Sequence, residues 1–462
     1  MSLPHRPPAS STRLDRLPVG SFHKRLLVLV GAGLFFDAFD IYLANSVLGA
    51  LVQTGWSSIG QNATFLSATA FGMLLGSVLA GVLGDRYGRK FTYQFNLALF
   101  GLASLACAAA PSITWLIGAR FLTGVGLGAE LVIGYGLLSE FVPPSHRGRW
   151  AALLSCMAQF GLFAATLTSW VVIPTLGWRA MFVIAGIGGL VVFVMRKNIP
   201  ESPRWLEEQG RTAEAEAIVR AIEAEAGASP AVAPTPAGPA SPAVAGPVRP
   251  FERRFRRPLA LGALTQIVQS AAIYGFVAWV PTFLLQQGIP INQSLGQSVL
   301  MSFGGPVGAL LAFLLSDRIG RKAAIIGGSV LAAIVGPLFA LAGSQALATG
   351  LGFVMFSLVY FLVSVIQAGY LPELFPTQVR MRLTSLAVTA GRLTSIATPF
   401  LVVFLVQAGG MLAVVTVVAL LLLLQAAAMA VIGVETNRRS LEEIASDAAA
   451  APDTAAMARP TS

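Results

Sequence analysis

Residues 81–90 read GVLGDRYGRK, and residues 313–322 read FLLSDRIGRK. Both contain the pattern Asp-Arg-x-Gly-Arg-Lys, which begins at Asp85 in the first copy and at Asp317, 232 positions later, in the second. Each copy lies between two long apolar runs. A charged turn of fixed spacing that occurs twice between apolar runs predicts a duplicated membrane bundle.

Two further loop motifs recur at almost the same offset. The segment from Glu140 to Arg147, EFVPPSHR, returns as ELFPTQVR from Glu373, 233 positions later, and PESPRWLEE at Glu201 returns in part as VETNRRSLEE at Glu435, 234 positions later. Three unrelated motifs with one spacing indicate that the second half is a copy of the first. Two homologous membrane halves are typical of alternating-access transporters.

The composition requires lipid as the main solvent. Of the 462 residues, 55% are hydrophobic and only 11% are charged, whereas a soluble protein carries about a quarter charged residues. The formal net charge of +10 is of the sign that nucleic-acid-binding proteins carry. The basic residues, however, lie in short loops between apolar runs, as membrane topology requires, and this placement argues against nucleic-acid binding. Cys107 and Cys156 both fall in apolar runs, which favours small core residues over a disulfide or a metal site.

A bilayer core of about 30 Å needs about 20 helical residues, and twelve apolar runs approach that length. The sequence therefore predicts an all-α membrane protein with twelve transmembrane helices in two pseudo-symmetric six-helix halves. The predicted spans are about 26–50, 62–84, 91–110, 114–139, 150–173, 178–195, 258–286, 294–316, 323–342, 348–370, 383–407 and 411–433.

Loop charges predict the orientation. Every second connection is basic, while the alternate ones, such as QTGWSSIGQN, are nearly uncharged with Arg179 as the clear exception. The positive-inside rule places the basic set and both termini in the cytoplasm, and the short outer loops favour a bacterial plasma membrane. The predicted division is a tail (1–23), a first bundle (24–197), a linker with a short helix and a disordered Pro/Ala segment (198–257), a second bundle (258–434) and a second tail (435–462).

The motifs carry a family resemblance. GVLGDRYGRK resembles the signature loop of the major facilitator superfamily, and the run from Arg120, RFLTGVGLG, resembles that superfamily's fourth-helix motif. PESPRWL and SLEEI are similar to the branch that holds sugar porters, organic-ion transporters and bacterial niacin transporters. Two positions depart from the pattern: Phe313 replaces a glycine and Val434 replaces a proline.

The resemblance implies a gate made of the charged loops, which latches the two halves in one conformation and releases them in another. The alternative is that these loops are only basic anchors. The implied gating residues are Asp85, Arg86, Arg89, Arg120, Glu140, Arg147, Asp317, Arg318, Arg321, Glu373 and Arg380. Gly124, Gly126 and Gly128 predict close packing of the fourth helix against a neighbour.

Charged residues within spans are costly, about 2.5–3.5 kcal/mol each on insertion scales, so each needs a reason. Asp37 and Asp40 share one face of the first span. They predict proton coupling in a wet cavity, or a structural partner for Arg120 in the fourth span. Glu130 lies ten residues after Arg120, too far along the axis to pair with it, and it is a third candidate for the proton path.

Arg392, in the eleventh span, is the leading candidate for substrate binding. No acidic residue accompanies it in that span, and a guanidinium beside a cavity forms a fork for a carboxylate. The resemblance supports this role, since organic-anion branches have an arginine at the matching point. The alternative is an ion pair with an acid on another span.

Polar residues in other spans bind either a ligand or a neighbouring helix. Together with Phe39 they suit a small planar polar solute. The predicted substrate-binding set is Tyr42, Asn45, Gln159, Gln266, Gln269, Tyr274, Trp279, Tyr360 and Gln367, with Arg392.

These features predict a proton-coupled importer of a small aromatic monocarboxylate such as nicotinate. The predicted partners are that solute, protons and the lipid bilayer, with no nucleic acid, no metal and no cofactor, and the expected state is a monomer. A sugar or polyol symporter and a drug or organic-cation exporter remain alternatives. A receptor would need an attached signalling domain, and neither the predicted tails nor the predicted linker suits one. An enzyme would need a nucleophile or a metal cluster, and His5, His23 and His146 lie in the tail and loops.

Overall fold

The computed structural model describes residues 13–14, 17–226, 253–375 and 377–436, and these residues are almost entirely helical. The predicted Pro/Ala linker segment and most of both predicted tails lie outside the described residues. The first half contains α2 (Ser21–Gln53), α3 (Ile59–Tyr87), α4 (Arg89–Ala108), α5 (Ile113–Phe141), α6 (Pro144–Leu176), α7 (Trp178–Met195), the 3₁₀ turn η1 (Arg196–Asn198), α8 (Pro203–Glu208) and α9 (Thr212–Glu225).

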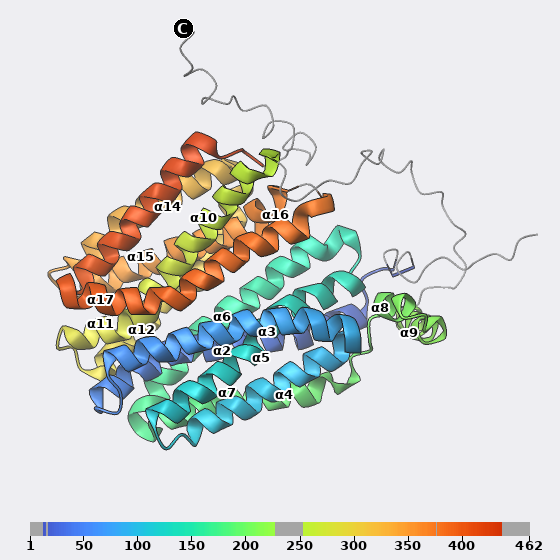
Figure 1. Ribbon diagram of the computed structural model, residues 1–462, viewed down its shortest axis with the longest axis horizontal. Helices are drawn as coiled ribbons and strands as arrows, with labels where there is room; N and C mark the ends of the chain where they lie inside the picture. Colours follow the sequence, from blue (N-terminus) through green and yellow to red (C-terminus); the bar gives the residue numbers. More distant parts are fainter. Residues whose placement is uncertain (1–12, 15–16, 227–252, 376, 437–462) are drawn as a thin grey trace, which may run out of the picture. The chain divides into compact units, whose positions relative to one another are not determined.

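The second half is also helical but more broken (Figure 1). It contains α10 (Arg253–Gly275), the 3₁₀ turn η2 (Val277–Trp279), α11 (Val280–Gln286), α12 (Ile291–Ser302), α13 (Gly304–Ile319), α14 (Arg321–Ala340), α15 (Gln345–Ser364), the π-helical turn η3 (Val365–Tyr370), α16 (Leu371–Glu373) and α17 (Thr377–Ile432).

Twelve membrane spans account for these helices, as the sequence predicts. Ten helical stretches among the described residues are long and apolar enough to cross a bilayer. One of them, Arg382–Ile432, has 51 residues and turns at Gly409 and Gly410, where Gly410 takes a positive φ of 64°, so it supplies two spans. The 29-residue α5 exceeds the roughly 20 residues that a span needs and supplies the twelfth.

Backbone packing divides the chain into two units. The first unit holds Met1–Val244 together with Ala278–Ser302, and the second holds Ala245–Val277 and Phe303–Ser462. The hairpin of α11 and α12 therefore packs with the first half, although its sequence lies in the second half. The breaks that separate it, η2 and the turn at Phe303, fall within predicted spans.

Close contacts attach this hairpin to α2 and α6 in the first unit. The hydroxyls of Thr166 and Ser302 lie 2.6 Å apart in a buried hydrogen bond. Gly296 faces the Trp170 indole, where a Cβ would lie 3.2 Å from Nε1. Gly49 on α2 leaves similar room for Leu285. Small residues at these three points allow the backbones to approach.

Glycines let α3 and α5 cross in direct backbone contact. A Cβ on Gly72 or Gly76 would overlap the backbone of α5, and a Cβ on Gly124 or Gly128 would overlap the backbone of α3. Gly126 faces the other way, toward α4, where a Cβ would lie 2.9 Å from the backbone of Asn96. The predicted close packing of the fourth helix is confirmed.

The second unit repeats this crossing with half the glycines. Gly304 and Gly308 on α13 lie against the backbone of α15 at Phe353 and Ser357. In the same unit, α10 packs along α17, and α14 packs between α15 and α17. A buried hydrogen bond of 2.8 Å from Gln425 to the Ser329 hydroxyl joins α17 to α14. The duplication is therefore visible in the packing as well as in the sequence.

The chain before α2 docks on the linker helix α9 in the first unit (Figure 1). Leu14 and Leu17 are buried in one apolar cluster with Val219 and Ile222 of α9. Part of the predicted polar tail thus contributes to a core. Its leucines supply the apolar face that α9, an amphipathic helix, needs to bury.

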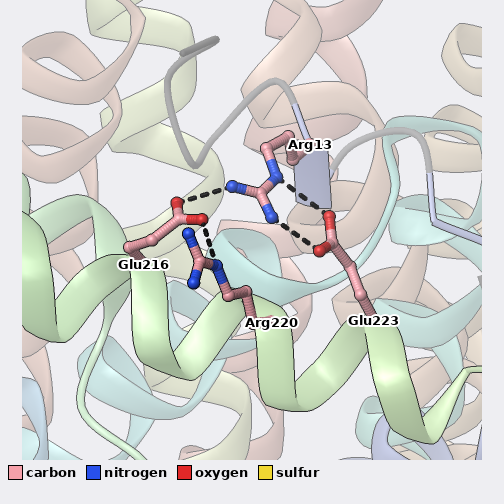
Figure 2. A network of polar contacts seen from close by, with 4 residues as sticks. All are labelled: Arg13, Glu216, Arg220 and Glu223. Carbon is pink, nitrogen blue, oxygen red and sulfur yellow. Dashed lines mark hydrogen bonds and ion pairs between the residues drawn. The ribbon is translucent and has the colours of Figure 1, made fainter. Parts of the chain in front are cut away.

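Arg13 fixes the polar side of this contact (Figure 2). Its guanidinium donates two hydrogen bonds to Glu223, at 2.9 and 2.6 Å, and a third to Glu216 at 2.5 Å. Arg220 donates to the other oxygen of Glu216 at 2.7 Å. The hydrogen bonds to Glu223 and Glu216 raise the pKa of Arg13 above its usual value. The hydrogen bond from Arg13 is also the main reason that the pKa of Glu216 lies below its usual value.

This network predicts that the docking of Arg13, Leu14 and Leu17 on α9 weakens in acid. A carboxylate with a lowered pKa stabilises the docked form above the unperturbed value of 4.5, and that contribution is lost as pH falls through the lowered pKa. Because the Glu216 side chain is 30% exposed, we expect a modest effect, about a two- to fivefold rise in amide hydrogen exchange of α9 between pH 6 and pH 3. Hydrogen exchange of the α9 amides, corrected for the pH dependence of the intrinsic exchange rate, measures this rise.

The matched control is the double variant Glu216→Gln with Glu223→Gln. It removes both carboxylates that Arg13 contacts and leaves the apolar cluster unchanged. We expect its α9 exchange to be faster at pH 6 and nearly independent of pH. An equal pH dependence in the native chain and in the double variant would show that other groups control the docking.

Candidate functional site

Asp40 on α2 and Arg120 on α5 form a buried ion pair in the first unit. Arg120 Nη1 lies 2.5 Å from Asp40 Oδ2, and the two side chains are 1% and 0% exposed. Ser104 on α4 donates to the other Asp40 oxygen at 3.2 Å. The sequence predicted that Arg120 could pair with Asp37 or with Asp40, and in the structure it pairs with Asp40.

The neighbours of Arg120 complete its surroundings. Its Nε donates to the Thr69 hydroxyl at 3.3 Å, and the guanidinium carbon lies 5.2 and 5.7 Å from the ring centroids of Phe65 and Phe182. These are distances at which an aromatic face attracts a cation. Arg120 therefore contacts a carboxylate, a hydroxyl and two aromatic rings.

Glu130 lies beside a second buried arginine, which the sequence analysis missed. Arg196 Nη1 donates to Glu130 Oε1 at 2.8 Å, with both side chains at most 1% exposed. The same guanidinium donates to the backbone oxygens of Leu29 and Val30 at 2.7 and 2.9 Å, and it stacks 3.9 Å from the Tyr93 ring centroid. In the sequence, Arg196 stands at the end of a predicted span (178–195), where basic residues are common, and nothing there distinguishes it from the other loop cations.

Gly33 makes room for this second pair. A Cβ at position 33 would overlap both the Arg196 guanidinium and the Glu130 carboxylate. Gly33 lies one turn before Asp37 on the same face of α2. The sequence contained one sign of this arrangement. Gly33, one turn before the intramembrane Asp37, leaves space on α2 for a charged side chain from another helix.

Asp37 differs from the other buried acids because neither of its carboxyl oxygens has a hydrogen-bond partner among the described residues. It is only 3% exposed. The charged groups that act on it through space are Glu130, Arg196 and Asp40. A buried carboxyl with unmet hydrogen-bonding capacity is costly in a structural role and typical of a functional one.

The remaining predicted site residues of the first unit differ in burial. Asn45 on α2 and Trp279 in η2 are buried, while Tyr42 and Gln159 are partly buried. The Oε1 atom of Gln159 and the Nε1 atom of Trp279 have no hydrogen-bond partner among the described atoms. Asp37 and Asp40 do share one helical face, as the spacing of three predicts.

In the second unit, two buried amides line one face of α10. Gln266 and Gln269 are 4% and 2% exposed, and within the described part of the chain the Gln266 Nε2 atom and both amide atoms of Gln269 have no hydrogen-bond partner. A Cβ on Gly391 of α17 would lie 2.9 Å from the Gln266 backbone oxygen. Arg392, partly buried, follows directly after this crossing point.

The other predicted site residues of the second unit differ in how far they are buried. Tyr360 on α15 is buried, Tyr274 on α10 is partly buried, and Gln367 is exposed on η3. The π-helical turn η3 is a type of distortion that is frequent at functional sites. The part of the predicted site that the structure brings together here is therefore the α10 amides and the α17 segment of Arg392.

The repeated loop motifs form equivalent helix caps. In the first unit, Gly88 takes a φ of 95° and α4 begins directly after it. The Glu201 carboxylate accepts the backbone N–H groups of Arg89 and Lys90 at 2.9 and 3.2 Å. Those amides have no partner within the helix, and a carboxylate also suits the positive end of the helix dipole.

The second unit repeats the cap with the second copy of each motif. Gly320 takes a φ of 91°, and the Glu435 carboxylate accepts the N–H groups of Arg321 and Lys322 at 3.0 and 3.1 Å. The equivalence that the sequence offset predicts, Glu201 with Glu435, is thus confirmed in atomic detail. In both units the glutamate comes more than 110 positions after the helix start that it caps.

The predicted gate is only partly described. Asp85 and Arg89 pair at 2.9 Å, Arg321 and Glu373 pair at 2.9 Å, and Arg86 and Arg318 are exposed. The side chains of Glu140, Arg147, Asp317 and Arg380 lie outside the described residues. The gating role of this set stays a prediction.

Three comparisons with known proteins agree with this architecture. The family model described as "Sugar (and other) transporter" matches residues 28–448. The inner membrane metabolite transport protein YdjE of Escherichia coli is 34% identical over 94% of this chain and 97% of its own length. The niacin transporter NiaP of Acinetobacter baylyi is 33% identical over 94% of this chain and 99% of its own length.

Among solved structures, a partially occluded inward-open conformation of the xylose transporter XylE from E. coli matches with a TM-score of 0.71. The match covers 91% of this chain and all of that chain at 17% identity. At this identity the likeness establishes the fold alone. That fold is the major facilitator fold that the repeated motifs predict.

Proposed function

The chain belongs to the family of sugar and other transporters, and from this premise we propose that it imports a small aromatic monocarboxylate, such as nicotinate, together with a proton. As a member of that family it is a multi-pass membrane transporter of a small solute. We further propose that it acts as a monomer in a bacterial inner membrane with both termini in the cytoplasm, because the basic connections alternate with uncharged ones.

One observation carries the substrate proposal: the buried amide of Gln269 on α10 has no hydrogen-bond partner among the residues that the structure describes. Leaving a buried amide without hydrogen bonds costs about 1–3 kcal/mol in a protein. A polar ligand that forms hydrogen bonds with the Gln269 amide would remove this cost. Gln266 has a free amide nitrogen one turn away on the same face. Two amide groups supply donors and acceptors for a compact polar solute.

Arg392 supplies the preference for an acid. It follows Gly391, which contacts the backbone of Gln266, so it is placed on α17 where that helix crosses the amides. A guanidinium forks onto a carboxylate through two parallel N–H groups. The 33% identity to a niacin transporter supports a carboxylate on an aromatic ring.

A sugar or polyol remains the second candidate, because free amides also bind hydroxyls and the matching family includes sugar transporters. Uptake of labelled nicotinate, benzoate and glucose into cells that express the chain separates the two. We expect uptake of the acids above that of empty-vector cells, and loss of this uptake with a proton uncoupler. Glucose uptake without acid uptake, or equal nicotinate uptake by empty-vector cells, would overturn the proposal.

Gln269→Ala is expected to raise the KM for the acid about tenfold or more. A hydrogen bond to a charged ligand contributes about 1.5–3 kcal/mol, and each 1.4 kcal/mol is a tenfold change in affinity. Gln407→Ala is the matched control, since Gln407 is an exposed glutamine on α17 of the same unit. Initial uptake rates over a range of concentrations measure both variants, and an unchanged KM in Gln269→Ala would remove this residue from the site.

Arg392→Lys and Arg392→Ala test the fork. We expect both to lose most acid uptake, because lysine keeps the charge but not the planar pair of donors. Loss in Arg392→Lys with retention in Arg392→Ala would contradict the fork geometry.

A further inference from the structure

A buried histidine lies where the start of α2 meets the α5–α6 turn, defined here as residues 141–150. His23 is the third residue of α2, and its side chain is 0% exposed. Its ring makes an edge contact with the Trp150 ring of α6, with 6.4 Å between the two ring centroids. The neighbouring Phe22 packs on Phe141, the last residue of α5, at a centroid distance of 5.4 Å. These contacts join α2 to both ends of the α5–α6 turn.

The hydrogen bonds of His23 require a neutral ring. The backbone N–H of Gly20 donates to His23 Nδ1 at 3.2 Å, so Nδ1 carries a lone pair and the proton of the neutral ring is on Nε2. Nε2 has no hydrogen-bond partner among the described residues. A second proton would have to bind to Nδ1, where it would face the N–H of Gly20. Protonation therefore removes the hydrogen bond that fixes the chain at the start of α2.

The surroundings of His23 also oppose a positive charge. The ring lies in the first turn of α2, at the positive end of the helix dipole. Of the described groups that act on it through space, His146 of α6 disfavours the charged ring, whereas Glu225 of α9 and the backbone of Phe141 favour it. Loss of hydration on burial is the largest effect, and it lowers the pKa of His23 below its usual value of 6.5.

We propose that His23 is an acid sensor at the cytoplasmic end of the first unit: the neutral ring holds the α5–α6 turn against α2, and protonation releases the turn. The segment EFVPPSHR, which contains the predicted gating residues Glu140 and Arg147, overlaps this turn. Release of the turn would therefore disturb the predicted gate. The inference rests on the proposed orientation, which places this end of the unit in the cytoplasm, and on the proposed import of an acid with a proton.

The direction of the pH effect follows from the proton affinities of the two forms. In the released form the ring is hydrated and titrates near its usual value of 6.5, whereas the held form binds a proton less readily. Above this pH both forms are neutral and the turn is fully held. As pH falls below it, the released form gains the proton first and the held form is lost. An importer that brings in protons acidifies the cytoplasm, so the sensor would limit further uptake.

The first measurement is the titration of each histidine in the full-length protein. The chain has only three histidines, His5, His23 and His146, so NMR spectra of histidine-labelled protein in detergent resolve three rings. The variants His5→Gln and His146→Gln assign them. We expect His23 to titrate about one pH unit or more below His146, which is exposed. A His23 ring that titrates together with His146 would overturn the proposal.

The second measurement follows the α5–α6 turn by amide hydrogen exchange. His23→Gln is the test variant, because glutamine keeps an acceptor at the third position of a helix and does not titrate. We expect the ratio of native to variant exchange rates over residues 141–150 to rise about fivefold or more between pH 7.5 and pH 5. Comparison at equal pH cancels the intrinsic exchange rate.

His146→Gln is the matched control for exchange, since it removes a histidine from α6 that is exposed. It should show the same rise in acid as the native chain. An equal pH response in the native chain and in His23→Gln would contradict the proposal. Should His23→Gln fail to fold, the histidine titration decides the question without it.

The third measurement is initial uptake of labelled nicotinate by cells whose cytoplasmic pH is clamped at 7.5 or at 5.5. The change in proton driving force is the same for both chains, so we expect uptake by the native chain to fall about threefold further than uptake by His23→Gln. An equal fall in the two chains would refute the regulatory role. A difference that follows the outer pH would refute the proposed orientation. Absence of nicotinate uptake would refute the proposed function, while the titration and the exchange still decide whether His23 holds the turn.

Discussion

Gly128→Val on α5 strongly destabilises the first unit, whereas Gly118→Val on the same helix leaves its stability nearly unchanged: this is the largest effect that we expect. A Cβ at Gly128 would lie 2.6 Å from the backbone carbon atoms of Met73 on α3, but nothing lies within 4 Å of a Cβ at Gly118. A backbone cannot rotate away as a side chain can. We therefore expect a loss of about 3 kcal/mol or more.

Thermal unfolding in detergent, followed by size-exclusion chromatography, measures this difference. For a bundle of this size the loss corresponds to a drop of roughly 6 °C or more in the midpoint temperature. The two variants add the same side chain to the same helix, so helix propensity cancels between them. Equal midpoints for the two variants would mean that α3 and α5 are not held in backbone contact.

The second large effect is expected from Arg120→Met. It removes one partner from an ion pair whose side chains are 1% and 0% exposed, and it leaves the Asp40 carboxylate buried without a counter-charge. Breaking a buried pair in this way costs about 3–5 kcal/mol. The same thermal unfolding assay measures the loss.

A double variant and a surface pair make this prediction specific. Arg120→Met combined with Asp40→Leu should recover most of the lost stability, because two apolar side chains can replace a buried pair at little cost. Arg211→Met breaks the exposed pair with Glu214, whose side chains are 49% and 57% exposed, and should leave the midpoint temperature nearly unchanged because water already screens this pair. A loss in Arg120→Met no larger than that in Arg211→Met would refute the argument.

Repetition and hydropathy were the strongest parts of the sequence evidence. The twelve spans and the duplicated halves are confirmed, because each rests on patterns that extend over many residues. The equivalence of Glu201 and Glu435 is also confirmed, since both cap the helix that follows their own copy of the charged loop. Local spacing also placed Gln266 and Gln269 on one face of α10.

What the sequence could not provide was the choice of partners between distant helices. Arg196 looked like one loop cation among many, yet the fold buries it beside Glu130, 66 positions earlier. Arg13 belonged to a stretch that looked like a polar tail, yet it contacts Glu223, 210 positions later. Such pairings depend on how helices pack, and neither hydropathy nor spacing along one helix records that.

The hairpin of α11 and α12 shows that the boundary between the duplicated halves and the boundary between the packing units need not coincide. Ala278–Ser302 descends from the second copy of the duplication but packs with the first, and the matching stretch of the first half, from the end of α2 to the start of α3, stays with its own copy. An exchange of halves between related transporters at the linker would therefore separate this hairpin from the unit with which it packs. Chimeras should preserve Thr166, Trp170 and Gly49 together with the hairpin that they hold.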